Sequence, residues 1–163
     1  MKKLLLLLLL VLIGCSEPEP LNYGLLEEKD DIHYLKNTNE IYSGPVFNID
    51  GKSEGYIKKG KFDGPYKTYY ENGQLKVEGG YKDGILDGPY KSYYENGQLK
   101  EDSNYKNGYD GPYKYYYKNG QLKSEGTHKD NILDGPYKEY YENGQLKLER
   151  TFKDGKLIKS KEY

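Results

Sequence analysis

The most regular pattern in the chain is a series of short tyrosine-rich runs that are separated by polar turns containing glycine. Two markers repeat together along this series. Gly-Pro-Tyr begins at Gly64, Gly88, Gly111 and Gly135, and Asn-Gly-Gln-Leu-Lys begins at Asn72, Asn96, Asn119 and Asn143. Both markers advance by 24, 23 and 24 residues. Self-similarity at such a period predicts a repeat protein in which each unit is one supersecondary element.

Each repeat is predicted to be a β-hairpin that turns at its Asn-Gly pair. Asn-Gly between tyrosine-rich runs favours a two-residue type I′ turn, because both central residues of that turn need positive φ. The resulting register places Lys opposite an acidic residue in every repeat: Lys67–Glu78, Lys91–Asp102, Lys114–Glu125 and Lys138–Glu149. It also places Tyr opposite Leu: Tyr70–Leu75, Tyr94–Leu99, Tyr117–Leu122 and Tyr141–Leu146.

Neighbouring hairpins are expected to cover one another, since a lone two-stranded hairpin is marginally stable in water. The chain should turn again near Lys82 to Gly84 and enter the next repeat at its Gly-Pro pair, where proline does least harm to strand pairing. The predicted fold is therefore all-β, with stacked antiparallel β-hairpin repeats that form an elongated single-layer sheet or solenoid.

The N-terminus is predicted to be a lipoprotein signal peptide, including a signal helix. Lys2 and Lys3 precede an apolar run from Leu4 to Ile13 that is too short to span a bilayer. The segment Leu12-Ile13-Gly14-Cys15 resembles a bacterial lipoprotein signal, which implies acylation of Cys15. Cys15 is the only cysteine, so no disulfide can form within the chain. An ordinary signal peptide with an incidental free cysteine is the alternative.

Acylation would hold the protein on a membrane without a transmembrane helix, because two or more acyl chains give stable anchoring. Ser16 follows the cysteine, and the resemblance then implies passage to the cell envelope, at the outer membrane or the cell surface. Five segments are expected along the chain: a signal peptide at 1–14, a lipid-anchored tether at 15–30, a cap with a degenerate repeat at 31–62, four repeats at 63–155, and a C-terminal edge at 156–163.

The repeated motifs, above all Tyr-Tyr-Glu-Asn-Gly-Gln-Leu-Lys and Tyr-Lys-Asp-Gly, resemble the MORN repeat variant family. That family is found in bacterial surface lipoproteins and in proteins described as YwqK-type antitoxins. The resemblance covers about residues 31–155 and implies a rod or curved sheet of stacked β-hairpins. It says much less about biochemical role.

Composition argues for an ordered protein without catalytic chemistry. The chain has 21 Tyr, three Phe and no Trp, and its mean hydropathy is −1.02. Tyrosine rings supply the apolar surface that a disordered chain lacks.

Without Lys2 and Lys3 the net charge is −3, which gives no electrostatic footprint for nucleic acid. His33 and His128 lie in different units, so we expect no enzyme active site, no metal site and no cofactor.

One set of residues is a candidate binding site. The predicted register places four tyrosines opposite four lysines, so that phenol rings and ammonium groups would form a ladder along one face. Its members are Tyr69, Tyr93, Tyr116 and Tyr140 with Lys76, Lys100, Lys123 and Lys147. Such a ladder could stack on sugars or hold an extended partner. Alternatively, it only stiffens a one-layer sheet.

The expected function is that of a surface-anchored lipoprotein whose repeats form a non-enzymatic binding or adhesion scaffold. Its partners would be the membrane, through the N-terminal lipid, and an unknown protein or glycan, with no nucleic acid. An antitoxin or immunity protein of a toxin–antitoxin system is the alternative, and a purely structural role in the envelope is a third possibility. The lipid anchor discriminates, since an antitoxin that acts in the cytoplasm should not be exported.

Overall fold

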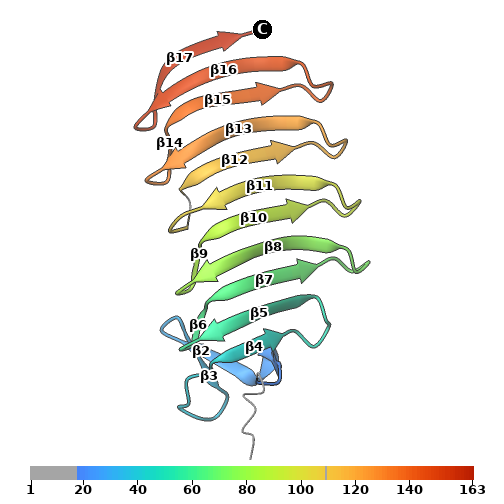
Figure 1. Cartoon of the computed structure of the whole chain (residues 1–163), viewed down its shortest axis with the longest axis vertical. Helices are drawn as coiled ribbons and strands as arrows, with labels where there is room; N and C mark the ends of the chain where they lie inside the picture. Colours follow the sequence, from blue (N-terminus) through green and yellow to red (C-terminus); the bar gives the residue numbers. More distant parts are fainter. Residues whose placement is uncertain (1–17, 109) are drawn as a thin grey trace, which may run out of the picture.

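The protein is an elongated, single-layer β-sheet with a small two-stranded sheet folded against its N-terminal end (Figure 1). The computed structural model describes residues 18–108 and 110–163. The main sheet contains 15 strands. The predicted signal helix and Cys15 lie outside the described residues.

The N-terminal part begins with β1 (Leu21–Asn22), the short 3-10 helix η1 (Tyr23–Leu25), β2 (Leu26–Lys29) and β3 (Ile32–Leu35). It continues with β4 (Gly44–Phe47), β5 (Ser53–Lys58) and β6 (Lys61–Phe62). The four repeats contribute β7 (Gly64–Tyr69) with β8 (Leu75–Lys82), β10 (Gly88–Tyr93) with β11 (Leu99–Tyr105), β12 (Gly111–Tyr116) with β13 (Leu122–Lys129), and β15 (Gly135–Tyr140) with β16 (Leu146–Lys153). The remaining strands are β9 (Ile85–Leu86), β14 (Ile132–Leu133) and β17 (Lys156–Glu162).

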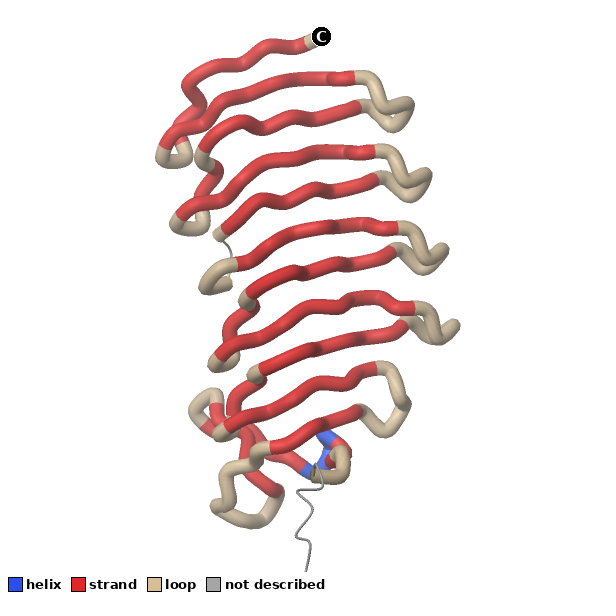
Figure 2. Tube along the Cα trace, viewed as in Figure 1, coloured by secondary structure: helices blue, strands red, loops and turns tan. Residues whose placement is uncertain are grey.

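The strands follow one another across the sheet nearly in chain order. The order is β1-β4-β5-β7-β8-β10-β11-β12-β13-β15-β16-β17, and β6, β9 and β14 are short strands paired beside this path. Neighbours are antiparallel except for β1 and β4, which are parallel. Figure 2 shows the strands lying across the long axis, with the turns along both edges. The predicted all-β fold of stacked hairpins is confirmed.

The turn inside each repeat differs from the predicted two-residue turn. In the first repeat, the Gly73 N–H donates to the Tyr70 carbonyl at 2.9 Å and the Tyr70 N–H donates to the Gln74 carbonyl at 2.8 Å. Gly73 has a φ of 80°, whereas Asn72 does not have positive φ. The loop is therefore a three-residue loop, a β-turn followed by a left-handed glycine, and the predicted type I′ geometry at Asn-Gly is wrong.

A β-bulge next to this loop restores part of the predicted register. Tyr69 pairs with Leu75 and Thr68 pairs with Val77, so Lys76 is the extra residue on β8. The predicted Tyr69–Lys76 and Tyr70–Leu75 pairs are wrong for this reason. Beyond the bulge the predicted Lys67–Glu78 pair is confirmed, and the other three repeats have the same bulge and the same Lys–acid pairs.

Two-residue turns with positive φ at both positions follow the second strand of several repeats. Asp83 and Gly84 have φ of 50° and 86°, and the flanking residues Lys82 and Ile85 are paired. Asp130 with Asn131, and Asp154 with Gly155, have the same geometry. Asp and Asn tolerate the left-handed conformation, which explains why these residues recur at the connections.

The small apolar core lies at the N-terminal end, where the β2–β3 hairpin covers the first strands of the main sheet. Leu26, Val46 and Ile57 are buried there, and Leu21, Tyr23, Leu35, Tyr42 and Phe62 pack around them. Residues 21–29 therefore belong to the fold, and the prediction that they form a tether was wrong. Pro18, Pro20 and the nearby acids suggested a linker, but the leucines between them cap the first hairpin.

Candidate binding faces of the sheet

The sheet has two faces of different chemistry, because successive side chains of a strand point to opposite sides. We call the side that carries Lys67, Glu78 and the residues aligned with them the ladder face. We call the other side, which carries Phe62, Tyr66, Tyr90, Tyr113, Tyr137 and Phe152, the ring face.

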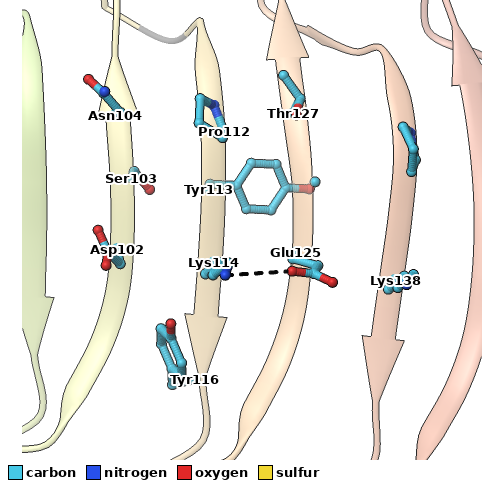
Figure 3. A pocket seen from close by; sticks show the side chains of 12 residues that line it. Asp102, Ser103, Asn104, Pro112, Tyr113, Lys114, Tyr116, Glu125, Thr127 and Lys138 are labelled. Atoms are coloured by element: carbon cyan, nitrogen blue, oxygen red, sulfur yellow. Dashed lines mark ion pairs between the residues drawn. The ribbon is translucent and has the colours of Figure 1, made fainter.

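A single row of alternating charges crosses the ladder face from β5 to β17. Each member is paired directly with the next, in the order Glu54, Lys67, Glu78, Lys91, Asp102, Lys114, Glu125, Lys138, Glu149 and Lys161. Figure 3 shows four of them, Asp102, Lys114, Glu125 and Lys138, side by side on neighbouring strands. The pairs within repeats were predicted, whereas the pairs between repeats were not. Together they give each repeat one cation and one anion in a straight line.

The lysines of this row are held loosely. The Lys114 ammonium lies 3.9 Å from the Glu125 carboxylate, and the Lys138 ammonium lies 3.6 Å from that of Glu149 (Figure 3 shows the first pair). Their side chains are 52% and 40% exposed. Exposed ion pairs of this kind contribute little to stability. The ammonium groups therefore remain accessible to an anionic ligand.

Four acids of the row, Glu54, Glu78, Glu125 and Glu149, also accept hydrogen bonds from tyrosine. Tyr93 donates its hydroxyl to Glu78 at 2.7 Å, and Tyr140 donates to Glu125 at 3.2 Å. Tyr69 likewise donates to Glu54 at 2.9 Å and Tyr163 to Glu149 at 2.6 Å. Burial, together with the Glu78 carboxylate, raises the pKa of Tyr93 to about 12. These bonds fix the orientation of these four rings on the ladder face.

The predicted tyrosine–lysine ladder is divided between the two faces. Tyr69, Tyr93, Tyr116 and Tyr140 lie on the ladder face. The lysines lie instead over the next tyrosine of each repeat, with nitrogen-to-centroid distances of 5.6 to 6.0 Å: Lys76 over Tyr70, Lys100 over Tyr94, Lys123 over Tyr117 and Lys147 over Tyr141.

The fourth repeat shows why the two sets are separated. Lys147 donates to Glu139 at 2.6 Å. Glu139 directly precedes Tyr140 in β15, so the two side chains point to opposite faces. The hydrogen bond from Lys147 holds the pKa of the Glu139 carboxyl below its usual range. The bulge causes this change, because a shift of one residue moves a side chain to the other face.

The turns at one edge of the sheet bind one another through side chains. Tyr70 donates its hydroxyl to the Tyr93 carbonyl at 2.7 Å, across to the next repeat. Tyr94 donates to Tyr116 and Tyr117 donates to Tyr140 in the same way, both at 2.8 Å. The side-chain amides of Asn72, Asn96 and Asn119 also donate hydrogen bonds to backbone carbonyls of the following loop. In the first three repeats this second tyrosine is structural, since it fixes the spacing to the next repeat.

Shallow hollows lie on the ladder face between the repeated prolines. One, of about 500 Å³, extends from β11 to β15 and includes Pro112, Pro136, Lys114, Lys138 and Tyr116 in its lining (Figure 3). Asp102 and Glu125 line the same hollow. A second, of about 570 Å³, lies at the N-terminal end and is lined by Pro20, Pro45, Phe47, Tyr56, Pro65 and Lys67, among others.

The ring face is occupied by aromatic side chains that pack against one another. Ring centroids are 5.5 Å apart for Tyr66 and Tyr81, 5.3 Å for Tyr90 and Tyr105, 4.8 Å for Tyr113 and His128, and 6.3 Å for Tyr137 and Phe152. Burial raises the pKa of Tyr113 to about 12. These contacts stabilise a sheet that has little aliphatic core.

The histidines lie far apart in the sheet. His33 is buried at the N-terminal end, where it bonds the Tyr23 hydroxyl at 2.7 Å and the Gly60 carbonyl at 2.8 Å, whereas His128 stacks on Tyr113. In the described part of the chain, no three His, Cys, Asp or Glu side chains are grouped so that they could hold a metal ion. No helix formed by residues 18–108 or 110–163 is long and apolar enough to cross a membrane.

Comparison with protein families gives one match. The model of the MORN repeat variant matches four segments, residues 62–83, 86–107, 109–130 and 133–154, which make up more than half of the chain. The first segment contains β7, its loop and β8, and therefore corresponds to one hairpin. No curated protein matches the sequence.

Proposed function

The chain belongs to the MORN repeat variant family, and from this premise we propose that it is a non-enzymatic scaffold that binds an extended partner along its ladder face. One observation carries the proposal. Each repeat presents a proline, a lysine, an acid and a tyrosine at the same positions on that face. A linear partner with a matching period can therefore make the same contact several times, and its affinity increases with the number of repeats engaged.

The ladder face is better suited to binding than the ring face. Its lysines are exposed and loosely paired, and the hollows lie between its prolines. On the ring face the aromatic rings already contact one another, and the N-terminal end is covered, since Tyr23 stacks on Phe62 with centroids 6.0 Å apart.

We further propose that a lipid on Cys15 anchors the scaffold in the cell envelope, at the outer membrane or cell surface. The fold begins at Leu21, only a few residues after Cys15, so the first hairpin would lie close to the bilayer. Twelve successive strands at about 4.8 Å spacing would then extend roughly 50 Å away from the N-terminal end. The repeats would present their ladder face along this length.

Capture experiments with two matched variants test the binding surface. The first carries Lys91→Gln, Lys114→Gln and Lys138→Gln on the ladder face, and the control carries Lys76→Gln, Lys100→Gln and Lys123→Gln near the turns. We expect the full chain and the control to capture the same partner from envelope and host-surface extracts, and the ladder-face variant to lose it. Equal capture by both folded variants would remove the ladder face as the site.

Metabolic labelling with a palmitate analogue tests the anchor. The wild-type chain should be labelled and partition with membranes, and a Cys15→Ser variant should not. An unlabelled wild-type chain that stays in the cytoplasm would contradict the anchor and favour the antitoxin alternative.

A further inference from the structure

We propose that the partner is an acidic, proline-rich segment in the polyproline II conformation, lying perpendicular to the strands across Lys91, Lys114 and Lys138. This inference rests on the proposed function and specifies the chemistry of its ligand. Four observations lead to it: the period of the ladder face, its fixed aromatic rings, its unequal charge pairing, and the proline that already lines its first hollow.

The period of the ladder face matches polyproline II better than other regular conformations. Each repeat contributes two strands, so equivalent side chains recur about every 9.5 Å along the sheet. Three residues of polyproline II rise about 9.3 Å, so the mismatch over four repeats stays near 1 Å. A β-strand repeats its side-chain direction after about 6.7 Å and an α-helix turns after about 5.4 Å, and both fall out of step. A polyproline II segment also has no internal hydrogen bonds to lose when it follows the curve of the sheet.

Two rings on the ladder face, those of Tyr93 and Tyr140, are held in place before any ligand binds. Tyr93 is fixed by its bond to Glu78, and Tyr140 by its bond to Glu125. Polyproline II segments dock on aromatic-lined grooves, and rings that are already ordered lose less conformational entropy on binding. Strand addition is not available on this face, because backbone groups inside the sheet already pair with both neighbouring strands.

Among the described residues, Lys114 and Lys138 have no close carboxylate partner, whereas two acids of the row are hydrogen-bonded. Glu78 and Glu125 each accept a tyrosine hydroxyl, whereas Lys114 and Lys138 approach a carboxylate only to 3.9 and 3.6 Å. A carboxylate on the ligand could therefore form a closer pair with each lysine. One acid every three residues would meet one lysine in every repeat. The geometry thus points to a ligand of repeated Pro-Glu-Pro type.

The chain itself places one proline of such a sequence against the ladder face. Pro20 lines the N-terminal hollow together with Pro45, Phe47 and Tyr56, and it follows Pro18 and Glu19. The equivalent hollow further along, between Pro112 and Pro136, has no such covering segment among the described residues. It offers the same combination of proline, tyrosine and lysine to a segment from another molecule.

A titration of the full chain with synthetic peptides tests the inference. The probe is a peptide of four Pro-Glu-Pro units, and shorter peptides of one to three units give the dependence on length. Three controls separate the contributions: Pro-Lys-Pro units reverse the charge, Gly-Glu-Gly units remove polyproline II, and Pro-Glu-Pro-Pro units keep the conformation but shift the acids out of phase.

We expect affinity to rise with each added Pro-Glu-Pro unit and all three controls to bind about tenfold or more weakly. The Lys91→Gln, Lys114→Gln, Lys138→Gln variant should lose the probe to the same extent, and the Lys76→Gln, Lys100→Gln, Lys123→Gln variant should retain it. Equal binding of the Gly-Glu-Gly or out-of-phase peptide, or of the ladder-face variant, would overturn the inference.

The result also separates this inference from the proposed function. If the probe does not bind but the ladder-face lysines are still needed to capture a partner, including a glycan, then the polyproline inference is wrong and the proposed function stands. If the ladder-face lysines affect neither the probe nor the captured partner, both are wrong.

Discussion

The Tyr93 hydroxyl donates a 2.7 Å hydrogen bond to the carboxylate of Glu78, which lies on the neighbouring strand β8 and on the same face of the sheet. Lys91, two residues before Tyr93 on β10, is paired with Glu78 on one side and with Asp102 on the other. One bond of this kind therefore connects the tyrosine row to the row of alternating charges. Because it spans from one repeat to the next, it also helps to fix how the repeats stack.

Removal of this bond should weaken the sheet without altering its fold. A Tyr93→Phe substitution keeps the ring and deletes only the hydroxyl, so we expect a loss of about 1 kcal/mol in the free energy of unfolding. Urea denaturation followed by circular dichroism measures it. Tyr56→Phe on the exposed part of the same face is the control and should change little, and an equal loss in both variants would contradict the assigned role of Tyr93.

The loop tyrosines offer a second matched pair. Tyr117 donates to the Tyr140 carbonyl of the next repeat, whereas Tyr141 belongs to the last repeat and is 44% exposed. Tyr117→Phe should cost about 1 kcal/mol in unfolding free energy, and Tyr141→Phe close to nothing. Similar losses at the two positions would show that these hydroxyls do not hold the repeats together.

The glycine that opens each repeat gives a steric test. Gly111 has a φ of 135°, and a Cβ there would overlap the carbonyl oxygen of Asn104. Gly135 has a φ of 101°, but no atom lies within 4 Å of its Cβ position. Gly135→Ala should cost about 1 to 2 kcal/mol from backbone strain alone, and Gly111→Ala considerably more. Thermal unfolding of both variants compares them, and an equal cost would be inconsistent with the close contact at Gly111.

We expect the fold to be lost at alkaline pH, because several tyrosines have a raised pKa in the folded protein. The pKa of Tyr93 and of Tyr113 is raised to about 12, mainly by burial, and burial also raises the pKa of Tyr105. In the unfolded chain these groups titrate near about 10. Their contribution to stability is therefore complete below about pH 10 and is lost as the pH rises towards and through about 12.

Tyrosinate absorbance and circular dichroism, recorded together, should change in the same range. Ionisation of most tyrosines near pH 10 in a sheet that stays folded would contradict this prediction.

The sequence was sufficient for the fold and for four of the nine pairs in the charge row. Lys67 and Glu78 pair as predicted only because two deviations cancel: the loop has one residue more than a type I′ turn, and the bulge at Lys76 takes up one more on β8. Between the loop and the bulge the register is displaced by one residue. That displacement separated the predicted tyrosine–lysine ladder, since local sequence does not reveal a bulge.

The pairs between repeats and the N-terminal cap were harder to predict. The pairing of Glu78 with Lys91 depends on how β8 and β10 align across the short strand β9 and the left-handed Gly88, and turn chemistry alone does not fix that alignment. Pro18, Pro20 and several acids place Leu26 in a predicted tether, yet its burial depends on tertiary contacts with Val46 and Ile57. One sequence signal does indicate the complete row of alternating charges. In every repeat a lysine stands at the same position of the first strand, and an acid stands at the facing position of the second strand.

Photo-cross-linking from a defined position on each face tests the central claim most directly. A photoreactive residue replaces Asn104, which lines the hollow on the ladder face, or Lys123, which lies over Tyr117 near the turns. Each protein is irradiated with the peptide of four Pro-Glu-Pro units, and the adducts are mapped by mass spectrometry. We predict adducts from position 104, at peptide sites spaced three residues apart, and none from position 123. Adducts from position 123 with none from position 104 would contradict binding along the ladder face.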